Sequence, residues 1–198
     1  MCEPERRRRF QGAALHPADS LPEHSDQKHH HKNSANWAIN CRYCSTAKVD
    51  SVSIFAGHDG LHTRFCDGFT VTRCDFRTGD DAFAGNDNRD FVVRDCKINT
   101  SCNGFRMGCM NLTVKNCLFW GPGEYVHKIQ KRNNMLSAFV HFSPKDENPK
   151  LQSGNWLIED ITVKMWIIFT CTIMSRVSGR PDNRQQGLLF VMYKQKVF

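Results

Sequence analysis

The sequence predicts an all-β fold, a right-handed parallel β-helix with about 21–22 residues per turn. Residues 57–108 repeat when the sequence is shifted by 22 positions, and each unit holds three short alternating stretches separated by polar turns. A doubly wound α/β fold needs helices between its strands, and these units are too short to contain them. We therefore expect a solenoid, short or incomplete, whose turns stack about 4.8 Å apart.

Three apolar columns define the expected strands of each turn. The first column is Ala47-Val49, Phe69-Val71, Phe91-Val93, Leu112-Val114 and Trp156-Ile158. The second is Val52-Ile54, Cys74-Phe76, Cys96-Ile98, Cys117-Phe119 and Ile161-Val163. The third is Ala38-Ile39, Gly60-Leu61, Ala82-Phe83, Gly104-Phe105 and Tyr125-Val126. Since like residues stack on like in such a coil, each column should fill the interior.

The repeat also divides the chain. Residues 1–33 contain an arginine run and a histidine triplet without strand or helix periodicity, and are expected to be irregular or disordered. Residues 34–165 should form the β-helix domain, with a proline-containing loop at 143–154. Residues 166–198 are apolar and basic but do not restate the repeat. They either cap the open end of the coil, which needs cover, or have left the pattern.

Charge and hydropathy narrow the expected partners. The chain has a net charge of +7, but residues 34–165 carry 16 basic and 14 acidic side chains, so most of the excess lies outside the patterned region. This distribution argues against nucleic acid as a partner. No apolar run of membrane-spanning length is present, so no membrane partner is expected. No signal peptide is visible, and the chain is expected to be a monomer.

Three of the ten cysteines follow the repeat: Cys74, Cys96 and Cys117 are spaced 22 and 21 residues apart. We expect them to stack inside the coil as small buried side chains rather than form disulfides. Cys41 and Cys44 form a single C-x-x-C without a second pair at zinc-ribbon spacing, so no metal site is assigned there. The redox compartment stays open.

Three aspartates are the candidate catalytic residues. Asp59 and Asp81 occupy one column, Asp80 adjoins them, and Asn103 follows one turn later. Carboxylates brought together in this way raise one another's pKa values, which is how acid and base roles arise. Strict alternation would turn Asp81 into the interior, so residues 79–81 should form a bend rather than part of a strand. Aspartates that only form turns are the structural alternative.

The segments HDGLHT, TGDDAFAG and CNGFRMG resemble glycoside hydrolase family 28, the polygalacturonase-like enzymes with a pectin lyase-like fold. The resemblance covers roughly residues 34–165. It implies that Asp80 protonates the leaving glycosidic oxygen and that Asp59 and Asp81 hold and deprotonate the attacking water. It also implies an inverting hydrolase of pectin-like or other cell-wall polysaccharide, without a cofactor or metal, in an extracellular or cell-surface location.

The resemblance also directs attention to the substrate-binding residues. Asn103 stands where the family has histidine, His58 stands where it has threonine, and the family's R-I-K string is absent. The nearest cations that could bind a uronate carboxylate are Arg106, Lys128, Lys131 and Arg132, and the spacing assigns none of them. Arg106 is slightly favoured, because a guanidinium can donate two parallel hydrogen bonds to a carboxylate. Trp37 lies one period before Asp59 and is either a sugar-stacking platform or a packing residue.

Two other functions remain open from the sequence. A polysaccharide lyase on the same fold would recruit Ca²⁺ through carboxylates and abstract a proton with a basic side chain. A glycan-binding or structural β-helix without catalysis would use the acids as turn formers, and Asn103 in place of histidine favours it. The sugar, its linkage, and endo or exo action are not predicted.

Overall fold

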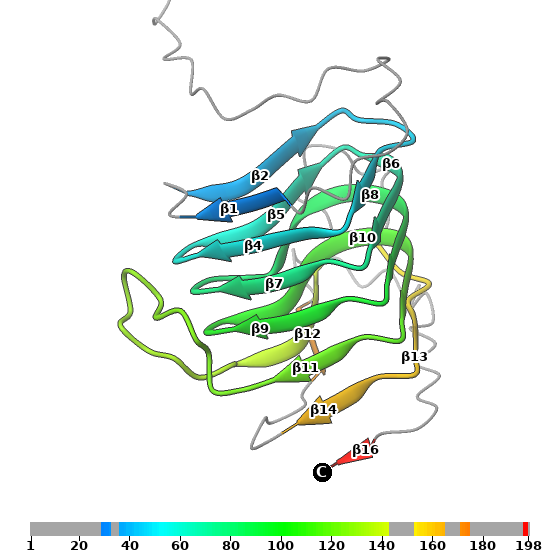
Figure 1. Cartoon of the computed structure of the whole chain (residues 1–198). Helices are drawn as coiled ribbons and strands as arrows, with labels where there is room; N and C mark the ends of the chain where they lie inside the picture. Colours follow the sequence, from blue (N-terminus) through cyan, green and yellow to red (C-terminus); the bar gives the residue numbers. More distant parts are fainter. Residues whose placement is uncertain (1–28, 33–35, 143–152, 165–170, 175–195, 198) are drawn as a thin grey trace, which may run out of the picture.

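The computed structural model describes residues 29–32, 36–142, 153–164, 171–174 and 196–197. They form a parallel β-solenoid of about 4 turns, and the described residues contain strands but no helix. Successive turns lie one below another from β2 to β14, as Figure 1 shows. The expected all-β solenoid is confirmed. Among the described residues there is no helix long and apolar enough to cross a membrane.

The strands line three faces of the coil. One face is a seven-stranded sheet in the order β1 (His29–Lys32), β4 (Val52–Ala56), β7 (Asp75–Thr78), β9 (Lys97–Thr100), β11 (Leu118–Trp120), β14 (Thr162–Lys164) and β16 (Lys196–Val197). The second contains β2 (Trp37–Arg42), β5 (Asp59–Arg64), the first parts of β8 (Phe83–Arg94) and β10 (Asn103–Lys115), then β12 (Ser137–Phe142) and β15 (Cys171–Met174). The third contains β3 (Lys48–Asp50), β6 (Asp67–Thr72), the later parts of β8 and β10, and β13 (Leu157–Glu159).

The predicted columns match the observed register for most of the chain. Phe69, Phe91 and Leu112 stand opposite one another in the first column, and Ile54, Phe76 and Ile98 do so in the second. All of these side chains are buried. Because aromatic rings recur at one position, they stack: the Phe69 and Phe91 ring centroids lie 5.0 Å apart. The repeat read from the sequence therefore fixes the core.

The third column departs from its prediction after Phe105. Phe105 pairs with Phe139, not with Val126, so Ala138-Phe139 takes the place predicted for Tyr125-Val126. Residues 121–136, between β11 and β12, instead leave the coil as a loop (Figure 1), here called the 121–136 loop. Gly121, Pro122 and Gly123 open this loop, and such a run ends a strand because proline lacks an N–H donor.

The described segments near the two chain ends pair with strands of the coil. Of residues 1–33 the structure describes only β1, which pairs in parallel with β4. Most of the expected 143–154 loop lies outside the described residues; at its end, Gly154 forms a bridge with Met110. Of residues 166–198, β15 pairs with β12 and β16 pairs with β14, so both described segments continue the sheets.

The cysteine column is buried as expected. Cys74, Cys96 and Cys117 are free thiols that stack inside the coil. Each lies near a backbone carbonyl, as Cys74 Sγ does 3.2 Å from the oxygen of Thr72. The side-chain hydrogen bond with Cys117, and to a smaller extent burial, raise the pKa of Cys96 to about 12, so this thiol stays protonated at neutral pH. Cys41 and Cys44 are also free thiols.

Candidate functional site

The bend at residues 79–82, between β7 and β8, positions two of the three predicted acids. It interrupts the strand pattern as expected, and Asp80 and Asp81 differ in exposure. The Asp80 side chain is 28% exposed, whereas Asp81 is buried. Thr78 and Thr100 fix the bend, because each hydroxyl donates to the Asp80 carbonyl oxygen, at 2.7 and 2.5 Å. Residues on two successive turns of the coil therefore fix the position of the Asp80 backbone.

Stacking brings the third acid beside these two. The amide of Gly60 donates to the carbonyl of Asp81 at 2.9 Å, so Asp59 lies one turn above Asp81. Oxygen atoms of Asp59, Asp80 and Asp81 all lie within 4.8 Å of one another. The adjacency predicted from the 22-residue period is therefore present in the structure.

The carboxyl groups differ in the ease with which they ionise. Burial, followed by the charges of Asp81 and Asp80, raises the pKa of Asp59 to about 8. Burial also raises the pKa of Asp81, to about 6, although hydrogen bonding from Asn103 opposes the rise. Arg106 lowers both pKa values by its charge. At neutral pH the site therefore combines a protonated Asp59 with a mostly ionised Asp81.

The 121–136 loop folds back over the bend. A Cβ on Gly79 would lie 2.5 Å from the carbonyl oxygen of Gly57 and 2.7 Å from that of Val126, so only glycine allows this approach. A Cβ on Gly57 would meet Lys128 Cε at 2.8 Å. Lys128 thus lies across Gly57, and its charge contributes to the lowered pKa of His58, after the larger effect of burial.

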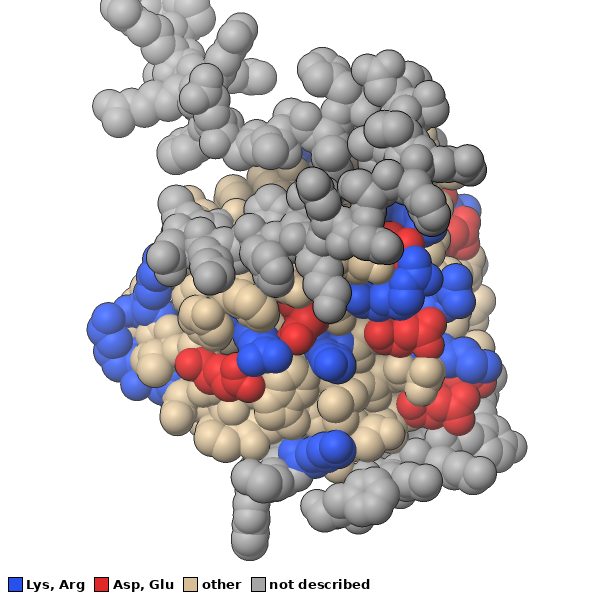
Figure 2. Space-filling view, in the orientation of Figure 1, with Lys and Arg blue, Asp and Glu red and all other residues tan. Residues whose placement is uncertain are grey.

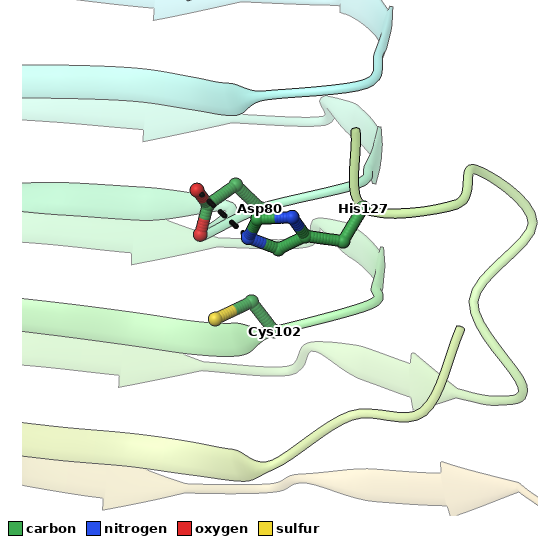
Figure 3. A group of neighbouring side chains, drawn as sticks. All are labelled: Asp80, Cys102 and His127. Carbon is green, nitrogen blue, oxygen red and sulfur yellow. Dashed lines mark ion pairs between the residues drawn. The ribbon is translucent and has the colours of Figure 1, made fainter. Parts of the chain in front are cut away.

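This loop delivers His127 to the acids. His127 Nε2 lies 3.2 Å from Asp80 Oδ2, and the imidazole is only 5% exposed. Figure 3 shows its ring directed at Asp80 from the loop, while Cys102 lies beside Asp80 on the next turn of the coil. The backbone amides of Ile129 and Gln130 donate to His127 Nδ1 at 3.2 and 3.1 Å. The loop therefore orients the ring that it supplies.

Among the described residues, two sets of side chains are close enough to share a metal ion: Asp80, Cys102 and His127, and the three aspartates. The first set is already occupied by hydrogen-bond donors. Arg132 Nη2 lies 3.1 Å from Cys102 Sγ, and a guanidinium beside the sulfur disfavours a second cation. His127 Nδ1 accepts two N–H groups, so the neutral ring carries its proton on Nε2, the atom a metal would need. This donor set fits a proton network better than a metal.

The exposed side of the site contains Trp37, His62 and Arg106. Trp37 pairs in register with Asp59, is 42% exposed, and its ring centroid lies 4.9 Å from that of His62. Arg106 is exposed on β10, opposite Ala84, and its charge reaches Asp59 and Asp81. An aromatic ring therefore lies in register with Asp59, and the charge of Arg106 reaches two of the acids.

Asn103 faces the interior instead. It is buried, and its backbone amide and side-chain Nδ2 both donate to Asp81 Oδ1, at 3.2 and 2.7 Å. It therefore orients Asp81 within the site. The structure brings Asp59, Asp80, Asp81 and Asn103 together, whereas Trp37 lies in register with Asp59 and Lys128 lies against Gly57. The sequence reasoning missed His127 and Cys102. The Gly-Pro-Gly run at 121–123 is the signal that a loop, not a strand, carries His127.

Comparison with known proteins adds no family to this picture. No family model, curated protein or solved structure matches the chain.

Proposed function

We propose that this protein is a glycoside hydrolase, similar to glycoside hydrolase family 28, that cleaves glycosidic bonds in a pectin-like or other cell-wall polysaccharide. The observation that carries the proposal is the group Asp59, Asp80 and Asp81, whose oxygens lie within 4.8 Å of one another. Two of these carboxyl groups have pKa values raised to about 8 and about 6. Glycoside hydrolysis needs one carboxylic acid and one carboxylate at the same pH, and these values provide both.

The surroundings of the acids support a sugar substrate. Trp37 offers a half-exposed ring next to Asp59, and indole faces stack on sugar rings. Arg106, beside the acids, and Lys128, above Gly57, are placed to bind carboxylates of an acidic glycan. The proposal therefore favours a uronate-containing chain over a neutral one.

The stereochemical outcome is part of the proposal and has its own measurement. Inversion is expected from the resemblance, yet the nearest carboxyl oxygens lie within 4.8 Å, closer than the roughly 6.5–9.5 Å typical of inverting enzymes. Proton NMR of the first-formed anomer distinguishes inversion from retention. Retention would overturn the inverting mechanism but leave hydrolysis intact.

The deciding experiment is product analysis on a panel of oligosaccharides, with oligogalacturonides first. Asp80→Asn and Asp81→Asn should each lower the release of reducing ends by a factor of about 10² or more, with little change in melting temperature. The matched control is Asp95→Asn in an exposed turn, where the side chain contacts Asn116, and it should keep full activity. Unchanged activity in both site variants would overturn the proposal.

The same panel separates the alternatives. A lyase would release an unsaturated, ultraviolet-absorbing product and lose activity with a chelator, whereas the proposed hydrolysis continues in EDTA. A glycan-binding module would retain an oligosaccharide without cleaving it. The buried amide of Asn103, in the place where the family has histidine, is the observation that favours this second candidate.

A further inference from the structure

The two oxygens of Asp80 are both hydrogen-bond acceptors in this fold. Asp80 Oδ1 accepts the backbone N–H of Asp81 at 3.0 Å, and Oδ2 lies 3.2 Å from His127 Nε2. Because Ile129 and Gln130 donate their amides to His127 Nδ1, the hydrogen-bond pattern assigns the ring proton of the neutral imidazole to Nε2. His127 therefore donates to Asp80. Both oxygens of Asp80 therefore face N–H groups, which fixes the orientation of its carboxyl group.

Asp59 has different surroundings from Asp80. It lies between Trp37 and Asp81 in the stack, and it faces the carboxyl groups of Asp80 and Asp81, with Arg106 as the nearby cation. Burial and the two acids raise its pKa to about 8, so Asp59 keeps its proton at neutral pH. Asp80 faces His127, His58 and Cys102 in addition to the other acids.

From this arrangement we propose that Asp59 is the proton donor of the hydrolysis, and that Asp80, oriented by His127 of the 121–136 loop, accepts the proton of the attacking water. The inference rests on the proposed function and deepens it. It exchanges the roles that the family resemblance implies, where Asp80 is the acid. His127 is a positioning residue, since it acts through Asp80.

The proton balance of the step is complete. As the bond between the anomeric carbon and the leaving oxygen breaks, Asp59 transfers its proton to that oxygen. The water oxygen forms the new bond to the anomeric carbon, and its proton passes to Asp80. The products each end in a hydroxyl group, Asp59 is left ionised and Asp80 protonated. Exchange with solvent restores both groups, and no other reactant is needed.

Leaving-group dependence separates the two roles. The probes are 2,4-dinitrophenyl and phenyl glycosides of an oligogalacturonide, the first of which departs without a proton. Asp59→Asn should lower kcat/KM for the phenyl glycoside by about 10²–10⁴ and leave the dinitrophenyl glycoside within about tenfold of wild type. Asp80→Asn should lower both equally. Asp59→Asn should also remove the alkaline limb of the pH profile.

Variants of the loop test His127. His127→Gln keeps an N–H donor at the same reach, and should retain kcat within about tenfold, whereas His127→Leu should lose about 10² in kcat with little change in KM. Ile129→Ala is the matched control, because its side chain is 76% exposed and its backbone amide is retained. Equal losses in the glutamine and leucine variants would show that His127 is only a packing residue and overturn its role.

Failure of the inference and failure of the function give different results. Suppose that the wild type cleaves both probes, and that Asp80→Asn rather than Asp59→Asn loses activity only on the phenyl glycoside. Hydrolysis is then supported, but the exchange of roles is overturned. If the wild type cleaves neither probe, the proposed function fails. Carbon-13 NMR of the aspartate carboxyl groups then still tests the assignment: a protonated Asp59 at pH 7, identified by its absence in Asp59→Asn, supports it, and an ionised one overturns it.

Discussion

The raised pKa of Asp59 lowers the stability of the folded chain at neutral pH. The pKa of this carboxyl group is about 8 in the folded chain and about 4 in an unfolded one. Between these values the unfolded chain releases a proton that the folded chain retains, so stability falls as the pH rises from about 4 to about 8. Each unit of pKa difference is worth about 1.4 kcal/mol, which makes the penalty several kcal/mol at most. Strained electrostatics of this kind are typical of active sites.

Asp59→Asn should therefore raise the free energy of unfolding at pH 8 and leave it nearly unchanged at pH 3.5, because the amide does not ionise. Urea unfolding at the two pH values measures the effect. Asp95→Asn, in an exposed turn, is the control and should show no such gain at pH 8. An equal effect of Asp59→Asn at both pH values would contradict the assignment of the raised pKa.

The 121–136 loop supplies groups that contact the bend at residues 79–82. It reaches back along the coil so that the carbonyl oxygen of Val126 lies against Gly79 and the ring of His127 meets Asp80. Further contacts come from Arg132, whose Nε donates to the carbonyl of Ser101 at 3.1 Å. Figure 2 shows basic side chains at the edge where this loop projects, while acidic and basic side chains alternate over the rest of the visible face. The loop thus adds positive charge beside the acids.

Gly79→Ala should separate the loop from the coil. The new Cβ would collide with two carbonyl oxygens, so we expect a loss of about 1–3 kcal/mol in the free energy of unfolding and a marked loss of activity. Gly154→Ala is the matched control, since no described atom lies within 4 Å of its Cβ position. Chemical denaturation of both variants is the measurement. Equal stabilities would show that the loop does not press on Gly79.

The whole molecule is a column of stacked rings whose core is continuous from turn to turn. Phe83, Phe105 and Phe139 stack with centroid separations of 4.4 and 5.1 Å, and Trp156 continues the column. His141 lies in this core with its ring 5.1 Å from that of Trp156. Neither ring nitrogen has a partner in hydrogen-bond geometry among the described atoms. Burial lowers the pKa of His141, and the nearby backbone of Ser153 opposes this effect only in part. The last turns of the coil therefore contain a polar group that resists protonation.

His141 should make the coil sensitive to acid. As the pH falls through 6.5, the unfolded chain binds a proton that the folded chain rejects, so the free energy of unfolding decreases. His141→Phe keeps a ring against Trp156 and should flatten this loss between pH 7 and pH 5. Thermal unfolding at both pH values measures the difference. A wild-type His141 ring that titrates near 6.5 by NMR would contradict this prediction.

The sequence by itself determined the coil and most of the site, because both follow from the period. Residues 22 positions apart must stack, which places Asp59 beside Asp81 and buries Phe69 on Phe91 without knowledge of any other contact. The bend at residues 79–81 follows equally, since strict alternation would otherwise make Asp81 an inward-facing strand residue. Only the tertiary structure decided which groups complete the site. A loop outside the repeat has no register with its neighbours, so the sequence does not predict its contacts. The contact of His127 with Asp80, and the position of Val126 outside the core, are seen only in the folded structure, where the loop lies over Gly79.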